Sequence, residues 1–142
     1  MRTTTHSEVQ TEVFAQQFAK RLKCGDIVAL LGGIGAGKTA FTRGLCVGLG
    51  YGGRVTSPTF NLLHEYCGDV CVRHYDLYRI NGAEDLEELG FWDGIDDCIT
   101  VIEWSERVLD VLSSDCWRVE IMRIGDEERQ IEIIGHEENY TL

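Results

Sequence analysis

The chain has 142 residues, a formal net charge of −11 and 44% apolar residues, with a single proline. This length and composition predict one soluble globular domain over residues 1–142 and exclude a disordered or low-complexity chain. No apolar run approaches the roughly 20 residues of a membrane-spanning helix. The polar first residues also lack the apolar core of a secretory signal. We therefore expect a cytoplasmic protein with no membrane segment.

Charge is divided unevenly along the chain. Residues 1–83 hold 9 Lys or Arg and 6 Asp or Glu, a net charge of +3, whereas residues 84–142 hold 4 and 18, a net charge of −14. Such an acidic chain does not bind a nucleic-acid backbone over its whole surface. If nucleic acid is the ultimate substrate, we expect another subunit to hold it. The acidic half is either a solvated surface or a face for a basic partner. The six cysteines are expected to be thiols, because their spacing completes no zinc site.

The first 50 residues predict a helix, a strand and a second helix. Residues 7–22 place apolar side chains at spacings of three and four, with Ser7 as the N-cap. The apolar face expected for this helix contains Val9, Val13, Phe14, Phe18, Ala19 and Leu22. Ile27–Leu31 is a short, wholly apolar run and is predicted to be the first strand of the sheet, buried on both faces. A second helix over 37–49 is expected to bury Phe41, Leu45 and Leu49.

The remainder of the chain alternates strands with short helices. Strands are expected over residues 60–66, 70–75, 99–102, 117–124 and 129–135. Short helices are expected over 83–97, burying Leu86, Leu89 and Phe91, and over 105–112. The first two and the last two of these strands flank short turns and are expected to form antiparallel hairpins. This order predicts an α/β fold, with a mainly parallel sheet flanked by helices and antiparallel additions.

The segment from Gly32 to Thr39, GGIGAGKT, matches G-x-x-x-x-G-K-[ST] between the predicted strand and helix. Its glycines let backbone N–H groups turn inward and form an anion nest at the positive end of the helix dipole. The residues expected to hold phosphate are Gly33, Gly35, Ala36, Gly37, Lys38, Thr39 and Ala40. Lys38 is expected on the β- and γ-phosphates, and the Thr39 hydroxyl on Mg²⁺. The motif therefore predicts a P-loop NTPase.

Two carboxylates follow predicted strands and could serve nucleotide hydrolysis. Glu103 ends the more apolar strand and is preferred for Mg²⁺, which leaves Asp76 to orient the attacking water or a switch segment. Trp104, next to Glu103, either lines the nucleotide pocket or packs in the core. Of His74 and Arg79, which flank Asp76, one is a candidate charge stabiliser and the other a locally paired residue.

Absent motifs narrow the choice of nucleotide and reaction. The sequence contains neither Asn-Lys-x-Asp nor Asp-x-x-Gly, which disfavours a guanine-specific switch GTPase and favours ATP. No stretch after the P-loop is long enough for an acceptor-binding domain with an arginine-rich lid. A small P-loop kinase is therefore kept only as an alternative.

Five blocks, in this order, resemble one family: GGIGAGKTAFTRGL, TSPTFNLLHEY, HYDLYRI, EDLEELG and IEW. They are similar to the TsaE family, also called YjeE, of small bacterial P-loop ATPases needed to make threonylcarbamoyladenosine in tRNA. The resemblance covers roughly residues 7–135. It implies an ATPase that is weak alone and resets a complex of TsaB and TsaD, whose TsaD subunit transfers the threonylcarbamoyl group to tRNA. The competing hypothesis is a nucleotide-gated assembly factor without essential hydrolysis.

The resemblance also assigns roles to individual residues. It implies that Lys38 and Thr39 bind phosphate and Mg²⁺, and that residues 56–59, including Thr59, form a switch segment. It implies that Asp76 is functional and that Glu103 binds Mg²⁺ beside Trp104. It also implies that adenine lies near Glu8 and Thr11. The sequence departs from the family at Gly33-Ile34, where an acidic residue and leucine are usual, and at Ser105, where proline is common. Asp126 stands where some members carry an arginine, and Arg129 is the nearby substitute.

Overall fold

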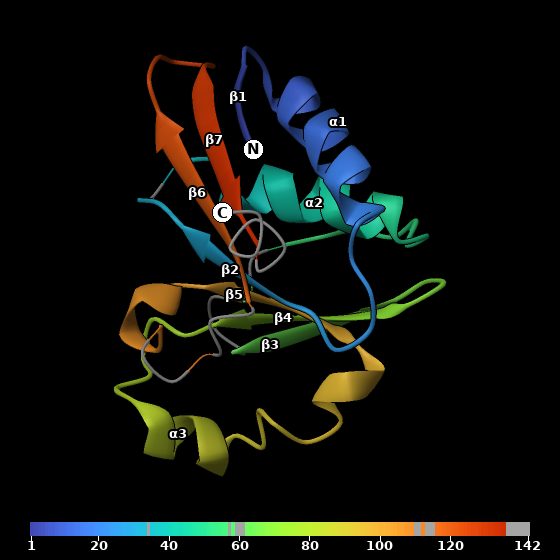
Figure 1. The fold of residues 1–142 in the computed structure, drawn as a ribbon, viewed down its shortest axis with the longest axis vertical. Coiled ribbons are helices and arrows are strands. Elements are labelled where there is room, and N and C mark those ends of the chain that lie inside the picture. The colour runs from blue at the N-terminus through green and yellow to red at the C-terminus, as the bar shows by residue number, and fades with distance from the viewer. Residues whose placement is uncertain (34, 57, 59–61, 110–111, 113–115, 136–142) are drawn as a thin grey trace.

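The computed structural model describes residues 1–33, 35–56, 58, 62–109, 112 and 116–135, which form a seven-stranded sheet flanked by helices (Figure 1). The strands are β1 (Arg2–Thr5), β2 (Ile27–Leu31), β3 (Leu63–Cys67), β4 (Cys71–Asp76), β5 (Ile99–Glu103), β6 (Trp117–Arg123) and β7 (Arg129–Ile134). The helices are α1 (Glu8–Ala19), α2 (Lys38–Gly48) and α3 (Ala83–Glu88), with short 3₁₀ helices η1 (Ile95–Asp97) and η2 (Ser105–Arg107).

The sheet has the strand order β1-β7-β6-β2-β5-β4-β3. Its four central strands, β6, β2, β5 and β4, run parallel, while β1, β7 and β3 add antiparallel pairs at the two edges. This confirms the expected α/β fold and both predicted hairpins. The expectation that Ile27–Leu31 is the first strand was wrong, because β1 precedes it and pairs with β7. Arg2–Thr5 has no apolar residue to reveal it, and its place is set by ladder hydrogen bonds at an edge.

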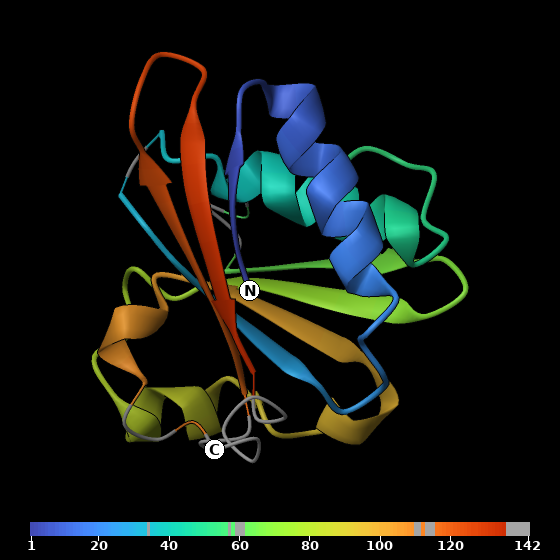
Figure 2. The same ribbon diagram turned by 45° about the horizontal axis from the view of Figure 1, so that its top comes forward.

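Alternate residues of β2 face two different apolar cores, one on each side of the sheet. Val28 and Leu30 pack with α1 and α2, whereas Ile27 and Ala29 pack with residues of the α3 side such as Phe91. Figures 1 and 2 show α1 and α2 together on one face, with α3, η1 and η2 on the other. Burial on both faces explains why this strand is wholly apolar rather than alternating.

The buried face of α1 differs from the one predicted. Val9 and Val13 are 66% and 45% exposed, and the buried positions are Thr11, Ala15, Phe18 and Ala19. The reason lies in α2, where a Cβ added to Gly44 would stand 2.2 Å from the Glu12 carbonyl oxygen. Helices that approach this closely accept only small side chains such as Ala15 between them, so the valines lie outside.

The structure also differs from the sequence predictions at three local points. Leu89 is 37% exposed instead of buried, although Leu86 and Phe91 are buried as predicted. Of the helix expected over 105–112, the structure shows the 3₁₀ turn η2, and residues 110 and 111 lie outside the described part. The strand expected from residue 60 begins at Leu63, and residues 60 and 61 also lie outside it. Across the described residues, no helix has the length and apolar character to span a bilayer.

Candidate nucleotide-binding site

A cleft of about 1280 Å³ opens at the carboxyl ends of β2, β5 and β4. These three strands are parallel neighbours, so the residues that follow them are brought to one edge of the sheet. The loop between β2 and α2, the start of α1, α3 and the β6–β7 turn contribute the other walls. Open α/β sheets bind ligands at this edge. The topology therefore gathers residues from distant parts of the chain around one cavity.

The loop between β2 and α2 is shaped by glycines with positive φ. Gly35 and Gly37 have φ angles of 77° and 106°, a conformation that is costly for residues with a Cβ. Gly37 is the N-cap of α2, and the first residues of that helix line the cleft. The first N–H groups of a helix have no intrahelical acceptor and carry the positive end of its dipole. This loop thus has the backbone that anion binding requires.

Lys38 is a buried cation at the base of the cleft. The residue is 6% exposed, and its Nζ is buried without a hydrogen-bond partner among the described residues. The Nζ lies 4.2 Å from the centroid of the Trp104 ring, in a cation–π contact. A buried ammonium without hydrogen-bond acceptors is unfavourable. An anion in the cleft would supply those acceptors.

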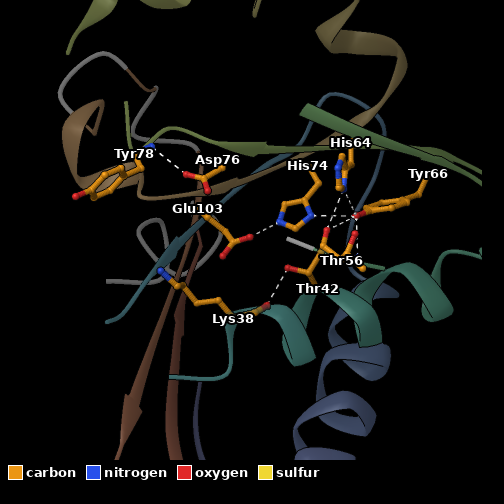
Figure 3. Close-up of polar contacts among 9 residues, drawn as sticks. All are labelled: Lys38, Thr42, Thr56, His64, Tyr66, His74, Asp76, Tyr78 and Glu103. Atoms are coloured by element: carbon orange, nitrogen blue, oxygen red, sulfur yellow. Dashed lines mark hydrogen bonds and ion pairs between the residues drawn. The ribbon is translucent and has the colours of Figure 1, made fainter. Parts of the chain in front are cut away.

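Asp76 and Glu103 stand opposite each other at the ends of β4 and β5, and both are nearly buried. Asp76 Oδ1 accepts a hydrogen bond from the backbone N–H of Tyr78 at 3.0 Å. Glu103 Oε2 lies 2.6 Å from His74 Nε2. Figure 3 shows the Glu103 carboxylate between His74 and Lys38. The two carboxylates are therefore neighbours in the cleft but are held by different partners.

A series of polar contacts continues from His74 away from the cleft (Figure 3). The Nδ1 of His74 lies 3.4 Å from the Tyr66 hydroxyl, which donates to the Thr56 carbonyl at 2.8 Å. Burial raises the pKa of the Tyr66 phenol to about 12, so the hydroxyl keeps its proton at neutral pH. Of the two residues flanking Asp76, His74 is the locally paired one, and Arg79 lines the cleft.

Trp104 has φ of 61°, a left-handed conformation unusual for a residue with a large side chain. Its ring lines the cleft between Lys38 and Tyr78, whose ring centroid is 5.0 Å away. The next residue, Ser105, is buried and its hydroxyl donates to the Leu30 carbonyl at 3.0 Å. Ser105 therefore ties the turn after β5 to the end of β2, beside the P-loop.

Most residues predicted from the sequence surround the cleft. Those that line it are Glu8, Thr11, Gly35, Ala36, Gly37, Lys38, Thr39, Ala40, Asp76, Glu103 and Trp104. Gly33 is not among the described residues that line it, although its carbonyl accepts the Ala36 N–H at 3.2 Å. Thr59 lies outside the described residues.

One wall of the cleft was missed by the sequence analysis. It consists of Leu62, Tyr78, Ile80, Asp85, Glu88 and Leu89. The one signal in the sequence is Leu89, an apolar residue within an acidic segment, for which the sequence predicts burial. Nothing local in the sequence shows that α3, on the face opposite α2, reaches the cleft at the carboxyl ends of the strands.

The β6–β7 turn closes another side of the cleft through Arg129. Its guanidinium donates to the carbonyls of Gly125, Asp126 and Glu128, and across the cleft to the Gly35 carbonyl at 3.2 Å. Asp126 and Arg129 both line the cleft. Arg129 thus holds the turn against the P-loop, and much of its hydrogen-bonding capacity is committed to backbone carbonyls.

Known proteins are similar to this chain in sequence and fold. A model of the family described as "Threonylcarbamoyl adenosine biosynthesis protein TsaE" matches residues 5–131. The chain is 38% identical over 139 residues to a tRNA threonylcarbamoyladenosine biosynthesis protein TsaE from Rickettsia conorii, covering 96% of this chain and 79% of the relative. The TsaE protein of Bacillus subtilis is 35% identical over 135 residues, covering 94% and 84%. The crystal structure of Bacillus subtilis YdiB superposes with a TM-score of 0.76 at 30% identity, covering 95% of this chain and 84% of that one.

Proposed function

The chain belongs to the TsaE family of threonylcarbamoyl adenosine biosynthesis proteins, and on this premise we propose that it binds and hydrolyses ATP in that tRNA modification pathway. The observation that carries the proposal is Lys38, whose buried Nζ has no hydrogen-bond partner in the described part of the chain. It lies beside a glycine loop and a helix N-terminus, where phosphate oxygens would provide charge-assisted hydrogen bonds.

The residues that line the cleft also suit a magnesium ion bound together with nucleotide. Among the described residues, no three His, Cys, Asp or Glu side chains gather into a metal site. Mg²⁺ does not need such a cluster, because it keeps several waters and binds through one or two protein oxygens and the substrate phosphates. We assign these oxygens to Thr39 and Glu103. Bound there, the ion would neutralise charge on the transferred phosphoryl group.

The remaining roles follow from position in the cleft. Asp76 lies beside Glu103 and is assigned to orienting the attacking water, its carboxylate being fixed by the Tyr78 N–H. Glu8 and Thr11, at the start of α1, are assigned to the adenine end. Each assignment rests on the shared cleft together with the family resemblance.

A magnesium titration separates these roles. ATP binding and turnover are measured against Mg²⁺ concentration for the wild type, Lys38→Ala, Glu103→Gln and Asp76→Asn. We expect Lys38→Ala to weaken ATP binding at every Mg²⁺ concentration. Glu103→Gln should raise the Mg²⁺ needed while leaving Mg²⁺-free binding intact, and Asp76→Asn should lower the turnover rate alone. Unchanged binding by a folded Lys38→Ala protein would refute the proposal, and a metal effect confined to Asp76→Asn would reverse the two acidic roles.

Hydrolysis is proposed to depend on the partners TsaB and TsaD. The sequence offers Arg43 and Arg79 as arginine fingers within the chain. Arg43 is paired with Glu8 and Glu12 on α1, which leaves Arg79, in the cleft, as the internal candidate. Such a group supplied in trans is worth about 10³ to 10⁵ in rate. ATP turnover is measured for the isolated chain and then with each partner added. Full turnover by the isolated chain would contradict partner dependence.

The salt dependence of association tests whether charge brings the partners together. The net charge of −14 over residues 84–142 favours a basic protein face over direct contact with tRNA. Association with TsaB and TsaD should therefore slow as salt is raised, and the isolated chain should bind tRNA weakly. Tight tRNA binding by the chain alone would overturn this part of the proposal.

The assembly-factor hypothesis makes a different prediction about hydrolysis. If ATP binding alone docks the protein, repeated rounds of tRNA modification should proceed equally well with a non-hydrolysable ATP analogue. If hydrolysis resets the complex, the analogue should support at most the first round. Comparing single and multiple turnovers of modified tRNA therefore distinguishes the two.

A further inference from the structure

Building on the proposed function, we propose that His74 is a positioning residue for Glu103, and that His74 and Tyr66 together link that carboxylate to the backbone at Thr56. The juxtaposition comes from the sheet, since His74 and Glu103 lie on the paired strands β4 and β5 and Tyr66 lies on β3. His74 and Glu103 are 29 residues apart, whereas Tyr66 lies eight residues from His74, across the β3–β4 hairpin, and ten from Thr56.

The His74 ring is held by a hydrogen bond at one nitrogen and lies against a hydroxyl oxygen at the other. The side chain is fully buried, and Nε2 lies 2.6 Å from Glu103 Oε2. Because a carboxylate only accepts hydrogen bonds, Nε2–H is the donor in this pair. On the other side, Nδ1 lies 3.4 Å from the Tyr66 hydroxyl, with the two ring centroids 6.0 Å apart. The imidazole therefore has little freedom to turn, and it fixes one oxygen of the Glu103 carboxylate.

Tyr66 joins this pair to the segment that begins at Thr56. Its hydroxyl has one proton, which it donates to the Thr56 carbonyl at 2.8 Å. His64 Nδ1 also approaches this junction, at 3.3 Å from the Tyr66 hydroxyl and 3.1 Å from the Thr56 carbonyl. The Tyr66 hydroxyl thus donates to one backbone carbonyl and lies within 3.4 Å of a ring nitrogen of each of two histidines (Figure 3).

Thr56 and Glu103, the two ends of this series of contacts, both lie in hollows that Thr39 lines. Glu103 and Thr39 line the main cleft, and Thr56 and Thr39 line a second hollow of about 510 Å³. Thr39, assigned to Mg²⁺, is therefore common to both. A displacement of the backbone at Thr56 would pass through Tyr66 and His74 to the carboxylate proposed for the metal. Partners that orient a metal ligand in this way typically change metal affinity or activity 10- to 100-fold when removed.

The first experiment needs no nucleotide. The side-chain ¹⁵N signals of His74 are recorded in the wild type, in Glu103→Gln and in Glu88→Gln, which changes an exposed carboxylate on the far wall of the cleft. We expect Glu103→Gln to shift the Nε2 signal and Glu88→Gln to leave it in place. An Nε2 signal that is indifferent to Glu103 would overturn the pairing, whether or not the protein binds ATP.

The second experiment tests the consequence with matched variants. His74→Gln keeps an N–H donor near the position of Nε2, His74→Leu removes both nitrogens, and Tyr66→Phe removes only the hydroxyl. We expect His74→Leu to raise the Mg²⁺ required for half-maximal ATP binding 10- to 100-fold, while Mg²⁺-free binding changes less than twofold. His74→Gln should restore most of the loss, and Tyr66→Phe should have a smaller effect. Melting temperatures measured on the same samples identify any variant that has unfolded.

The outcomes separate this inference from the proposed function. If the wild type binds no ATP, the proposed function fails, while the ¹⁵N result still decides the pairing. If the wild type binds Mg²⁺-ATP and a folded His74→Leu protein keeps the same Mg²⁺ requirement, the positioning role is refuted. Equal losses in folded His74→Gln and His74→Leu proteins would also refute it, because restoring the donor would then not matter.

Discussion

Replacing Lys38 by methionine separates what this side chain does for the fold from what it does for a ligand. Methionine keeps an unbranched apolar stem and removes the ammonium. In the ligand-free protein, the Nζ has its contact with the Trp104 ring, worth about 0.5 to 2 kcal/mol, but no hydrogen-bond partner among the described residues. Because removing this charge also removes its desolvation cost, we expect the free energy of unfolding to stay within about 1 kcal/mol of the wild type or to rise.

The effect on ATP should have the opposite sign. A hydrogen bond to a charged group contributes about 1.5 to 3 kcal/mol. At roughly 1.4 kcal/mol for each tenfold change, the loss of one such bond weakens ATP binding about 10- to 150-fold. The loop backbone and the start of α2 remain, so some affinity should persist.

The assay combines denaturant unfolding without nucleotide and equilibrium ATP binding, both on the same Lys38→Met preparation. Lys20→Met, at an exposed lysine that caps the end of α1, is the control and should change neither quantity. Unchanged ATP affinity in a folded Lys38→Met protein would refute the role of Lys38 in the site. A fall in unfolding free energy of more than about 2 kcal/mol would refute the view that its charge is poorly satisfied without ligand.

Further predictions concern packing and titration. Gly44→Ala should lower the free energy of unfolding by about 1 to 3 kcal/mol in denaturant, because the added Cβ would stand 2.2 Å from the Glu12 carbonyl oxygen. A Cβ added at Gly52 has no atom within 4 Å, so Gly52→Ala is the control and should be nearly neutral. Burial raises the pKa of the Cys46 thiol to about 12, so at pH 8 this thiol should be alkylated much more slowly than that of exposed Cys24. Mass spectrometry of both sites checks this, and equal alkylation rates would contradict the prediction. Burial likewise raises the pKa of the Tyr66 phenol to about 12, above its usual value of 10.0, so the folded protein holds this proton more tightly than the unfolded chain. The stability that the protonated phenol contributes is therefore complete below pH 10 and is lost as the pH rises toward 12. Unfolding measured against pH should show that loss in the wild type and less of it in Tyr66→Phe.

The sequence by itself determined the features that depend on neighbouring residues. The P-loop could be predicted because positive φ angles at Gly35 and Gly37, a buried strand before them and a helix after them are all local requirements. The apolar run Ile27–Leu31 likewise predicts a strand buried on both faces, whatever its partners are. Asp76 and Glu103 were found because each directly ends a recognisable strand.

Tertiary structure decided which of those residues meet and which faces are buried. The sequence gives no register between strands, so it did not show that His74 holds Glu103 or that Tyr66 reaches Thr56. It also did not show that α1 buries Ala15 instead of Val9. Helix periodicity identifies apolar candidates, but the separation between two helices decides which side chains fit between them. Strand pairing and helix approach are long-range properties, and their energies depend on contacts that no local pattern contains.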